Sequence, residues 1–252
     1  MFLIQLSQTQ HWLIAFALNA LLIALAQRLP LLTPAGWVHA GALGTILWGC
    51  LGWQGWLGVA LYLVLGSLVT RLGMAQKQRA GIAEARGGRR GPENVWGSAA
   101  TGAVIAIFIK LGIGSQPLLL LGFTASFAAK LADTFGSEIG KRWGRTTILI
   151  TTLRPVPAGT DGAISLEGTL ASGLGSVLMT AVMAPMFLLS QGSQAILLVA
   201  VIGFLATLME SLLGAIAQDK ISWLSNELVN GLQTSFAALM AMAFAVGLGL
   251  TG

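Results

Sequence analysis

The sequence has little of the residue chemistry on which many soluble enzymes depend. Its 252 residues include one cysteine, Cys50, and two histidines, His11 and His39. A single cysteine excludes a disulfide framework, and so few Cys and His side chains argue against a structural zinc site. Charged residues make up only 9% of the chain, whereas a typical soluble domain has about 25%. This is too little charge to cover a water-facing surface, so the sequence does not describe an ordinary soluble domain.

The composition instead predicts an all-α, polytopic integral membrane protein with one transmembrane domain over residues 1–252. The chain is 55% apolar with a mean hydropathy of +0.80, and its 33 glycines suit closely packed transmembrane helices. A spanning helix needs about 20 mainly apolar residues. Eight segments meet this requirement: 11–27, 36–52, 54–73, 94–112, 117–138, 166–190, 194–216 and 229–250.

Basic residues fall in alternate loops of this topology. Of the 14 Lys and Arg residues, 13 lie on one side and only Lys110 lies on the other. Basic residues favour the cytoplasmic side of a membrane, so this side, which carries the loops 75–92 and 141–165, is predicted to be cytoplasmic. The net charge of +5 is then explained by topology, without a nucleic-acid partner. An even number of spans places both termini on the non-cytoplasmic side, unless 36–52 and 54–73 form a re-entrant hairpin.

The first ten residues contain no basic residue, which excludes the pattern of a signal or transit peptide in this stretch. We therefore expect a prokaryotic inner or thylakoid membrane, with the active site facing the cytoplasm. The loop 75–92 is basic and rich in glycine. It is either a topology determinant that attracts anionic lipid headgroups or a part of the substrate site.

The richest polar stretch is 132–145, with the sequence ADTFGSEIGKRWGR. If it is helical, Asp133, Ser137 and Lys141 share one face and Glu138 lies beside it. A carboxylate followed by Lys141, Arg142 and glycines suits a site where Mg²⁺ and basic groups bind phosphate. An ordinary helix end on the cytoplasmic side would explain the basic residues but not the acids, which are costly in a membrane span.

Other polar residues lie toward the same predicted side. Arg154 is suited to bind a phosphate through two hydrogen bonds. Ser165 and Glu167 mark the N-terminus of the next span, where backbone amides attract anions. Taken alone, however, each residue is better explained as a plain N-cap (Ser165) or a first-turn acid (Glu167).

Three further segments contribute candidate binding residues. These residues are Asn94, Glu210, Asn226, Glu227 and Asn230. Hydrogen bonding between spans is the alternative for Asn230, and a charge-complemented helix N-terminus is the alternative for the segment of Asn94.

Residues 125–141 (ASFAAKLADTFGSEIGK) and 153–169 (LRPVPAGTDGAISLEGT) resemble the integral-membrane phytyl-phosphate kinase family of the vitamin E pathway. The segments 210–215 (ESLLGA) and 226–230 (NELVN) are similar to C-terminal motifs of that family. The resemblance covers roughly residues 75–250. The pattern Asp-Thr through Gly-Lys-x-x-Gly, followed by Ser-x-Glu-Gly, is also similar to dolichol kinases and membrane CTP-dependent cytidylyltransferases.

The resemblance implies a membrane lipid kinase of tocopherol (vitamin E) biosynthesis. Such an enzyme transfers a phosphoryl group from a nucleoside triphosphate, CTP or ATP, to phytyl monophosphate or a similar isoprenyl phosphate in the bilayer. A CTP-dependent lipid cytidylyltransferase and a secondary transporter are the alternatives.

Under the kinase hypothesis, each candidate residue receives a role. The catalytic residues are Asp133, Lys141 and Glu167. The Mg²⁺ ligands are Asp133, Glu138 and Glu167. The substrate- and phosphate-binding residues are Asn94, Ser137, Arg142, Arg154, Glu210, Asn226, Glu227 and Asn230.

Overall fold

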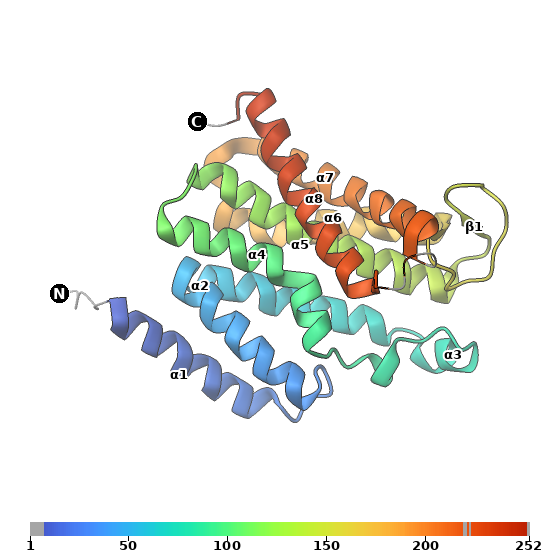
Figure 1. Ribbon diagram of the computed structural model, residues 1–252, viewed down its shortest axis with the longest axis horizontal. Coiled ribbons are helices and arrows are strands. Elements are labelled where there is room, and N and C mark those ends of the chain that lie inside the picture. Colours follow the sequence, from blue (N-terminus) through green and yellow to red (C-terminus); the bar gives the residue numbers. More distant parts are fainter. Residues whose placement is uncertain (1–7, 219–220, 222, 251–252) are drawn as a thin grey trace.

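The computed structural model describes residues 8–218, 221 and 223–250, which form a bundle of long helices (Figure 1). Lys220, one of the basic residues assigned to the cytoplasmic side, lies outside the described residues. The elements are α1 (Gln8–Ala26), α2 (Pro34–Arg71), α3 (Met74–Arg79), η1 (Ala85–Gly88), α4 (Pro92–Leu111), α5 (Gln116–Trp143), β1 (Thr147–Leu149), β2 (Ala163–Ser165), α6 (Leu166–Phe187), η2 (Leu189–Gln191), α7 (Gly192–Leu213), η3 (Gly214–Gln218) and α8 (Asn226–Gly247).

Seven helices in the described part of the chain are long and apolar enough to cross a membrane, which agrees with the predicted helical membrane fold. One of them, α2, has 38 residues, which is about 57 Å of helix or roughly twice the thickness of the hydrocarbon core. Gly52 has φ 71° and ψ −164° and divides α2 into halves, 34–51 and 53–71. The halves fold back on each other, so that the two ends of α2 lie close together. The guanidinium of Arg71, the last residue of α2, donates a hydrogen bond to the carbonyl of Pro30, just before α2 begins.

With the halves of α2 counted separately, the described residues contain eight long apolar helical segments, the number of spans that the sequence predicts. Figure 1 shows α1 beginning and α8 ending at one end of the bundle, whereas α3 and β1 lie at the opposite end. The described residues therefore fit an even number of passes. Which end faces the cytoplasm stays a prediction.

The centre of the bundle is α5, which packs against α2, α4, α6, α7 and α8. The residues around Phe123 and Phe127 are fully buried, and these two rings form an edge-to-face pair with centroids 5.1 Å apart. By contrast α1 lies at the edge, packs mainly on α2 and keeps most of its apolar side chains exposed, as expected for a helix that faces lipid.

Small residues allow the helices to approach α5 closely. A Cβ atom at Gly175 of α6 would lie 2.8 Å from the Leu131 carbonyl oxygen, and a Cβ atom at Gly203 of α7 would lie 2.9 Å from Ala128. Such small side chains bring backbones together in membranes, where water does not drive association of apolar helices. Glycines of this glycine-rich chain thus lie where α6 and α7 contact α5.

A short β-hairpin interrupts the all-helical pattern. β1 and β2 pair antiparallel, with Thr147 opposite Ser165, inside the loop that joins α5 to α6. Gly162, at φ 72°, lies just before β2 and close to α7. A Cβ atom there would lie 2.5 Å from the Ser211 carbonyl oxygen, so a residue with a side chain would not fit. The hairpin is an addition to the predicted fold and holds the loop 158–165 against the helix ends.

The close contact at Gly175 gives a direct test of the packing. We expect Gly175→Leu to lower the free energy of unfolding by about 1–3 kcal/mol, because the added side chain must displace Leu131 and Phe135. Gly231→Leu is the matched control, since nothing lies within 4 Å of a Cβ atom there. Thermal unfolding in detergent measures both, and equal midpoints for the two variants would contradict the packing of α6 on α5.

Candidate functional site

A cavity of about 270 Å³, called the polar cavity below, lies among the ends of α4, α5, α6, α7 and α8 and the loops 84–91 and 158–165. Six of the nine acidic residues and five of the 14 basic residues of the chain line it. The acids are Glu84, Asp133, Glu138, Asp161, Glu210 and Glu227. The bases are Arg86, Arg89, Arg90, Lys130 and Lys141. A chain with 9% charged residues thus gathers much of its charge around one hollow.

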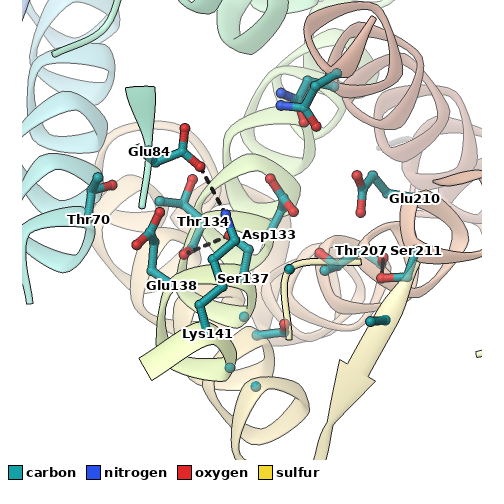
Figure 2. A pocket seen from close by; sticks show the side chains of 18 of the residues that line it. Thr70, Glu84, Asp133, Thr134, Ser137, Glu138, Lys141, Thr207, Glu210 and Ser211 are labelled. Atoms are coloured by element: carbon teal, nitrogen blue, oxygen red, sulfur yellow. Dashed lines mark hydrogen bonds and ion pairs between the residues drawn. The ribbon is translucent and has the colours of Figure 1, made fainter. Parts of the chain in front are cut away.

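One face of α5 forms a wall of the polar cavity. Asp133, Ser137 and Lys141 all line it, as the spacing of four residues predicts for a helix that continues to Trp143. Figure 2 shows Lys141 reaching toward Glu84 from this face, with Asp133 on the side toward Glu210. The structure therefore brings these three predicted site residues together.

Lys130 pairs with the Asp133 carboxylate in the wall of the polar cavity. Its ammonium forms an ion pair with Asp133 and donates a hydrogen bond of 2.8 Å to the Asn230 Oδ1 of α8. Lys130 is 5% exposed, so its charge depends on these partners. Asp133 and Asn230, predicted from separate motifs, are joined through a lysine that was not among the predicted site residues.

Glu84 and Lys141 form an ion pair of 3.1 Å across the cavity. Partial burial acts to raise the pKa of the Glu84 carboxyl, but the Lys141 ammonium, with Lys130 and Arg90 farther away, outweighs it and holds the pKa below its ordinary value. A carboxyl with a lowered pKa loses its stabilising charge only when the pH falls through that lowered value. The ion pair therefore stays intact at neutral pH.

Glu138 has a different environment from Asp133. Its carboxylate pairs with the Lys77 ammonium of α3, which also donates a 2.7 Å hydrogen bond to the Thr70 carbonyl oxygen. Both charged side chains are almost fully buried, at 1% and 2% exposure. This pairing gives Glu138 a structural role in tying α3 and α2 to α5, and leaves it less available to a metal ion than the sequence predicts.

Glu210 faces Asp133 across the polar cavity (Figure 2). Among the described residues, no side chain forms a hydrogen bond or an ion pair with its carboxylate. A carboxylate on a membrane-spanning helix is costly without a partner. Of the acidic groups in the cavity, Glu210 is thus the one that a bound cation would stabilise most.

Asn94 links the α4 wall to α8. Its Oδ1 accepts hydrogen bonds of 3.0 Å from the Gly91 amide and from Arg86, and its Nδ2 donates to Glu227 over 3.2 Å. Asn226 lines the same cavity. The segment 91–97, for which the sequence left a helix N-terminus as the alternative, therefore contributes both to a cap and to the cavity wall.

Three predicted site residues lie outside the polar cavity within the described chain. The Glu167 carboxylate accepts a hydrogen bond of 3.3 Å from the Arg145 amide, at the first turn of α6 that Ser165 caps. The Arg142 guanidinium stacks 4.9 Å from the Trp143 ring centroid, on a different helix face from Lys141. Arg154 is exposed in the loop between β1 and β2, where its carbonyl accepts a hydrogen bond of 2.9 Å from the Leu149 amide.

These placements correct the predicted three-carboxylate metal set. Asp133, Glu138 and Glu167 do not form one cluster, since Glu138 pairs with Lys77 and Glu167 points away toward Arg145. In the described residues, no group of three or more His, Cys, Asp or Glu side chains is close enough to hold a metal ion. Any metal site here would combine protein carboxylates with oxygens from a substrate.

Sequence reasoning missed several residues that line the polar cavity. They include Lys130 and Asp161, whereas Glu84, Arg86 and Arg90 belong to the loop 75–92, which the sequence left open as part of the substrate site. The spacing of three between Lys130 and Asp133 is a signal for a helical ion pair that the sequence already carried. The other four lie in loops or at a helix end, where hydropathy carries no information about contacts.

Comparisons with known proteins agree with this architecture. The profile of a family described as integral membrane protein DUF92 matches residues 17–238. An uncharacterized membrane protein of Synechocystis, sll0875, is 49% identical over 234 residues, which cover 92% of this chain and 90% of that protein.

A plant relative and an archaeal relative are more distant. Protein VTE6, chloroplastic, of Arabidopsis thaliana is 41% identical over 94% of this chain and 72% of that protein. An uncharacterized membrane protein of Methanocaldococcus jannaschii, MJ0933, is 33% identical over 82% of this chain and 83% of that protein. No solved structure gives a significant match. The family resemblance predicted from the motifs is confirmed.

The Lys77–Glu138 pair can be separated experimentally from the rest of the cavity. We expect Lys77→Met to destabilise the protein by about 3–5 kcal/mol, because it leaves the buried Glu138 carboxylate without a counter-charge. The double variant Lys77→Met/Glu138→Leu should recover most of this loss, since an apolar pair replaces the ion pair. Unfolding in detergent measures both variants. A double variant as unstable as the single one would rule out this role for Glu138.

Proposed function

The chain belongs to the DUF92 family of integral membrane proteins, and we propose that it is a membrane kinase acting on a prenyl phosphate. In this proposal, the polar cavity binds a nucleoside triphosphate, CTP or ATP, together with phytyl monophosphate or a similar isoprenyl phosphate. The product is the corresponding diphosphate. The resemblance of residues 125–169 to phytyl-phosphate kinases and the 41% identity to VTE6 support this assignment.

The observation that carries the proposal is the mixed charge of the polar cavity at one end of an apolar bundle. Phosphoryl transfer needs alignment and charge neutralisation more than covalent chemistry. Lys130, Lys141 and Arg90 supply positive charge for phosphate oxygens, and Asp133 and Glu210 supply carboxylates. A lipid phosphate lies at the membrane surface, so a cavity among helix ends suits its headgroup.

Asp133 and Glu210 are suited to hold Mg²⁺ in this cavity. Mg²⁺ in nucleotide-dependent enzymes usually takes one or two carboxylates, with substrate phosphates and water as its other ligands. Two carboxylates in one cavity, one of them without a hydrogen-bonding partner among the described side chains, fit this requirement. When bound, Mg²⁺ would neutralise charge on the phosphate oxygens. We assign the metal to Asp133 and Glu210, in place of Glu138 and Glu167.

The reaction requires little proton transfer by protein side chains. An oxygen of the prenyl phosphate forms a bond to the γ-phosphorus, the bond from that phosphorus to the β,γ-bridging oxygen breaks, and the nucleoside diphosphate leaves. The attacking oxygen is already anionic, so no strong general base is required. Neither His11 nor His39 lines the polar cavity, which agrees with this requirement. Lys141 and Lys130 would orient the phosphates and stabilise the charge that moves toward the leaving group.

One assay tests the proposal against the alternatives. Purified protein is incubated with Mg²⁺, phytyl phosphate and either ATP or CTP labelled in both the γ-phosphate and the base. We expect phytyl diphosphate that carries the γ-phosphate label and no base label. A lipid that carries the base label would identify a cytidylyltransferase. The absence of any new lipid product with either nucleotide would refute the kinase and favour transport.

The two carboxylates of the polar cavity can be tested by removing one charge at a time. We expect Asp133→Asn and Glu210→Gln each to lower kcat by about 10²-fold or more, because each removes charge stabilisation that acts in the transition state. Glu167→Gln is the matched comparison, since its carboxylate lies outside the cavity and should be dispensable. Elution on size-exclusion chromatography controls for folding. Near-normal turnover in Asp133→Asn, or an equal loss in Glu167→Gln, would contradict this assignment.

A further inference from the structure

A second cavity, called the apolar chamber below, lies between α1, α2 and α4 and has a volume of about 260 Å³. Its walls are mostly aliphatic and aromatic. They include Leu22, Ile23, Leu43, Val59, Leu63 and Ala99. The chamber is formed mainly by the first two helices, the region in which the family motifs are sparse.

The apolar chamber adjoins the polar cavity. Arg90, Asn94 and Ser98 line both. At this boundary, the Arg90 guanidinium donates a hydrogen bond to the Tyr62 hydroxyl and lies 5.0 Å from the centroid of the Tyr62 ring. The Tyr62 hydroxyl donates in turn to the Ser98 Oγ over 3.0 Å. A molecule that spans the boundary would meet apolar walls on one side and charged groups on the other.

The backbone holds Arg90 at this boundary. Its amide donates to the Leu31 carbonyl, and its carbonyl accepts from the Thr33 amide, each over 3.0 Å. The loop between α1 and α2 is thereby attached to the start of α4. Gly66 leaves room for the guanidinium, because a Cβ atom there would lie 2.6 Å from an Arg90 nitrogen. Arg90 is therefore positioned by contacts that do not use its charge.

The Arg90 guanidinium keeps donors for a ligand. It has five N–H groups, and among the described side chains its hydrogen-bond acceptor is the Tyr62 hydroxyl. No carboxylate in the described residues lies within 4.0 Å of it. A phosphate group suits such a site, since guanidinium and phosphate form paired hydrogen bonds.

Two polar side chains of the apolar chamber, Trp56 and Asn19, pair with each other. The Trp56 Nε1 donates to the Asn19 Oδ1 over 2.8 Å, and the Asn19 Nδ2 donates to the Ala15 carbonyl over 2.8 Å. Trp56 lies six residues before Tyr62, which is about 9 Å along the helix. The chamber therefore extends from the boundary at Arg90 to an apolar region in which Trp56 and Asn19 are already paired.

We propose that the apolar chamber binds the part of the prenyl tail nearest the phosphate, with that phosphate at Arg90. This inference rests on the proposed kinase function and adds to it the binding site of the lipid tail. A single chain with one phosphate at its end matches one apolar chamber of about 260 Å³ that shares Arg90 with the polar cavity. Membrane phospholipids, which carry two chains on a glycerol, match it less well. In this arrangement α1 and α2 select the acceptor, whereas α4–α8 carry the reacting groups.

A photoreactive probe tests the tail site without requiring turnover. The probe is a phytyl phosphate analogue with a diazirine in the second isoprene unit, added to the full chain in detergent without nucleotide. We expect labelling of peptides from α1, α2 and α4 that unlabelled phytyl phosphate competes away. Ala60→Phe narrows the chamber and should reduce this labelling roughly tenfold, as expected for the loss of about two buried methylene contacts.

Leu68→Phe is the matched control on the same helix, because Leu68 is 59% exposed and lies outside the chamber. It should label as the wild type does. Ala40→Phe fills the chamber from the other half of α2 and gives a second filling variant in case Ala60→Phe does not fold. The thermal unfolding midpoint of each variant shows whether it is folded. Loss of labelling in a stable filling variant, with retention in Leu68→Phe, supports the tail site.

Other outcomes overturn it. Unchanged labelling in both filling variants, or labelling spread over the outward helix faces, would place the tail elsewhere. Labelling that phospholipid competes but phytyl phosphate does not would assign the chamber to a bilayer lipid. The diphosphate product is measured separately. Competed labelling without product would therefore refute phosphoryl transfer but support the tail site, whereas product without chamber labelling would refute only the tail site.

Discussion

The end of this bundle is organised by the cost of placing charge inside an apolar protein. An ionised side chain away from water must find a counter-charge or hydrogen-bonding partners. Lys130 meets this requirement through Asp133 and Asn230, and Lys77 meets it through Glu138. Each set of contacts joins separate elements of the chain. The same interactions that neutralise the charges therefore hold the helix ends around the polar cavity.

The acidic residues fall into groups with different partners. Glu138 is enclosed with Lys77 and stabilises the packing of α3 on α5. Glu210 faces the cavity with no hydrogen-bonding or ion-pair partner among the described residues. Asp133 lies between these cases, because it is paired but still lines the cavity. In a membrane enzyme, a carboxylate without a protein partner is the better candidate for a ligand, since the ligand then offsets the cost of burial.

The two cavities divide the chain in a way that matches the distribution of its motifs. The polar cavity is built largely from α4–α8, where the kinase-like motifs lie, while the apolar chamber is built largely from α1 and α2. A chamber for hydrocarbon needs only apolar side chains of suitable size, which leave no recognisable pattern in a membrane protein. Arg90 belongs to both cavities and is the point at which a phosphate and its tail would meet.

The sequence alone determined the helical membrane fold, its long apolar helical segments and the shared face of Asp133, Ser137 and Lys141. A span must satisfy its own backbone hydrogen bonds, and helical spacing sets which neighbours align. Only the tertiary structure decided which distant carboxylates meet. Glu210 faces Asp133 across the cavity, whereas Glu167 turns toward Arg145. The reason is that such meetings depend on how each helix is rotated against its neighbours. Close packing of small side chains sets that rotation, and hydropathy does not record it.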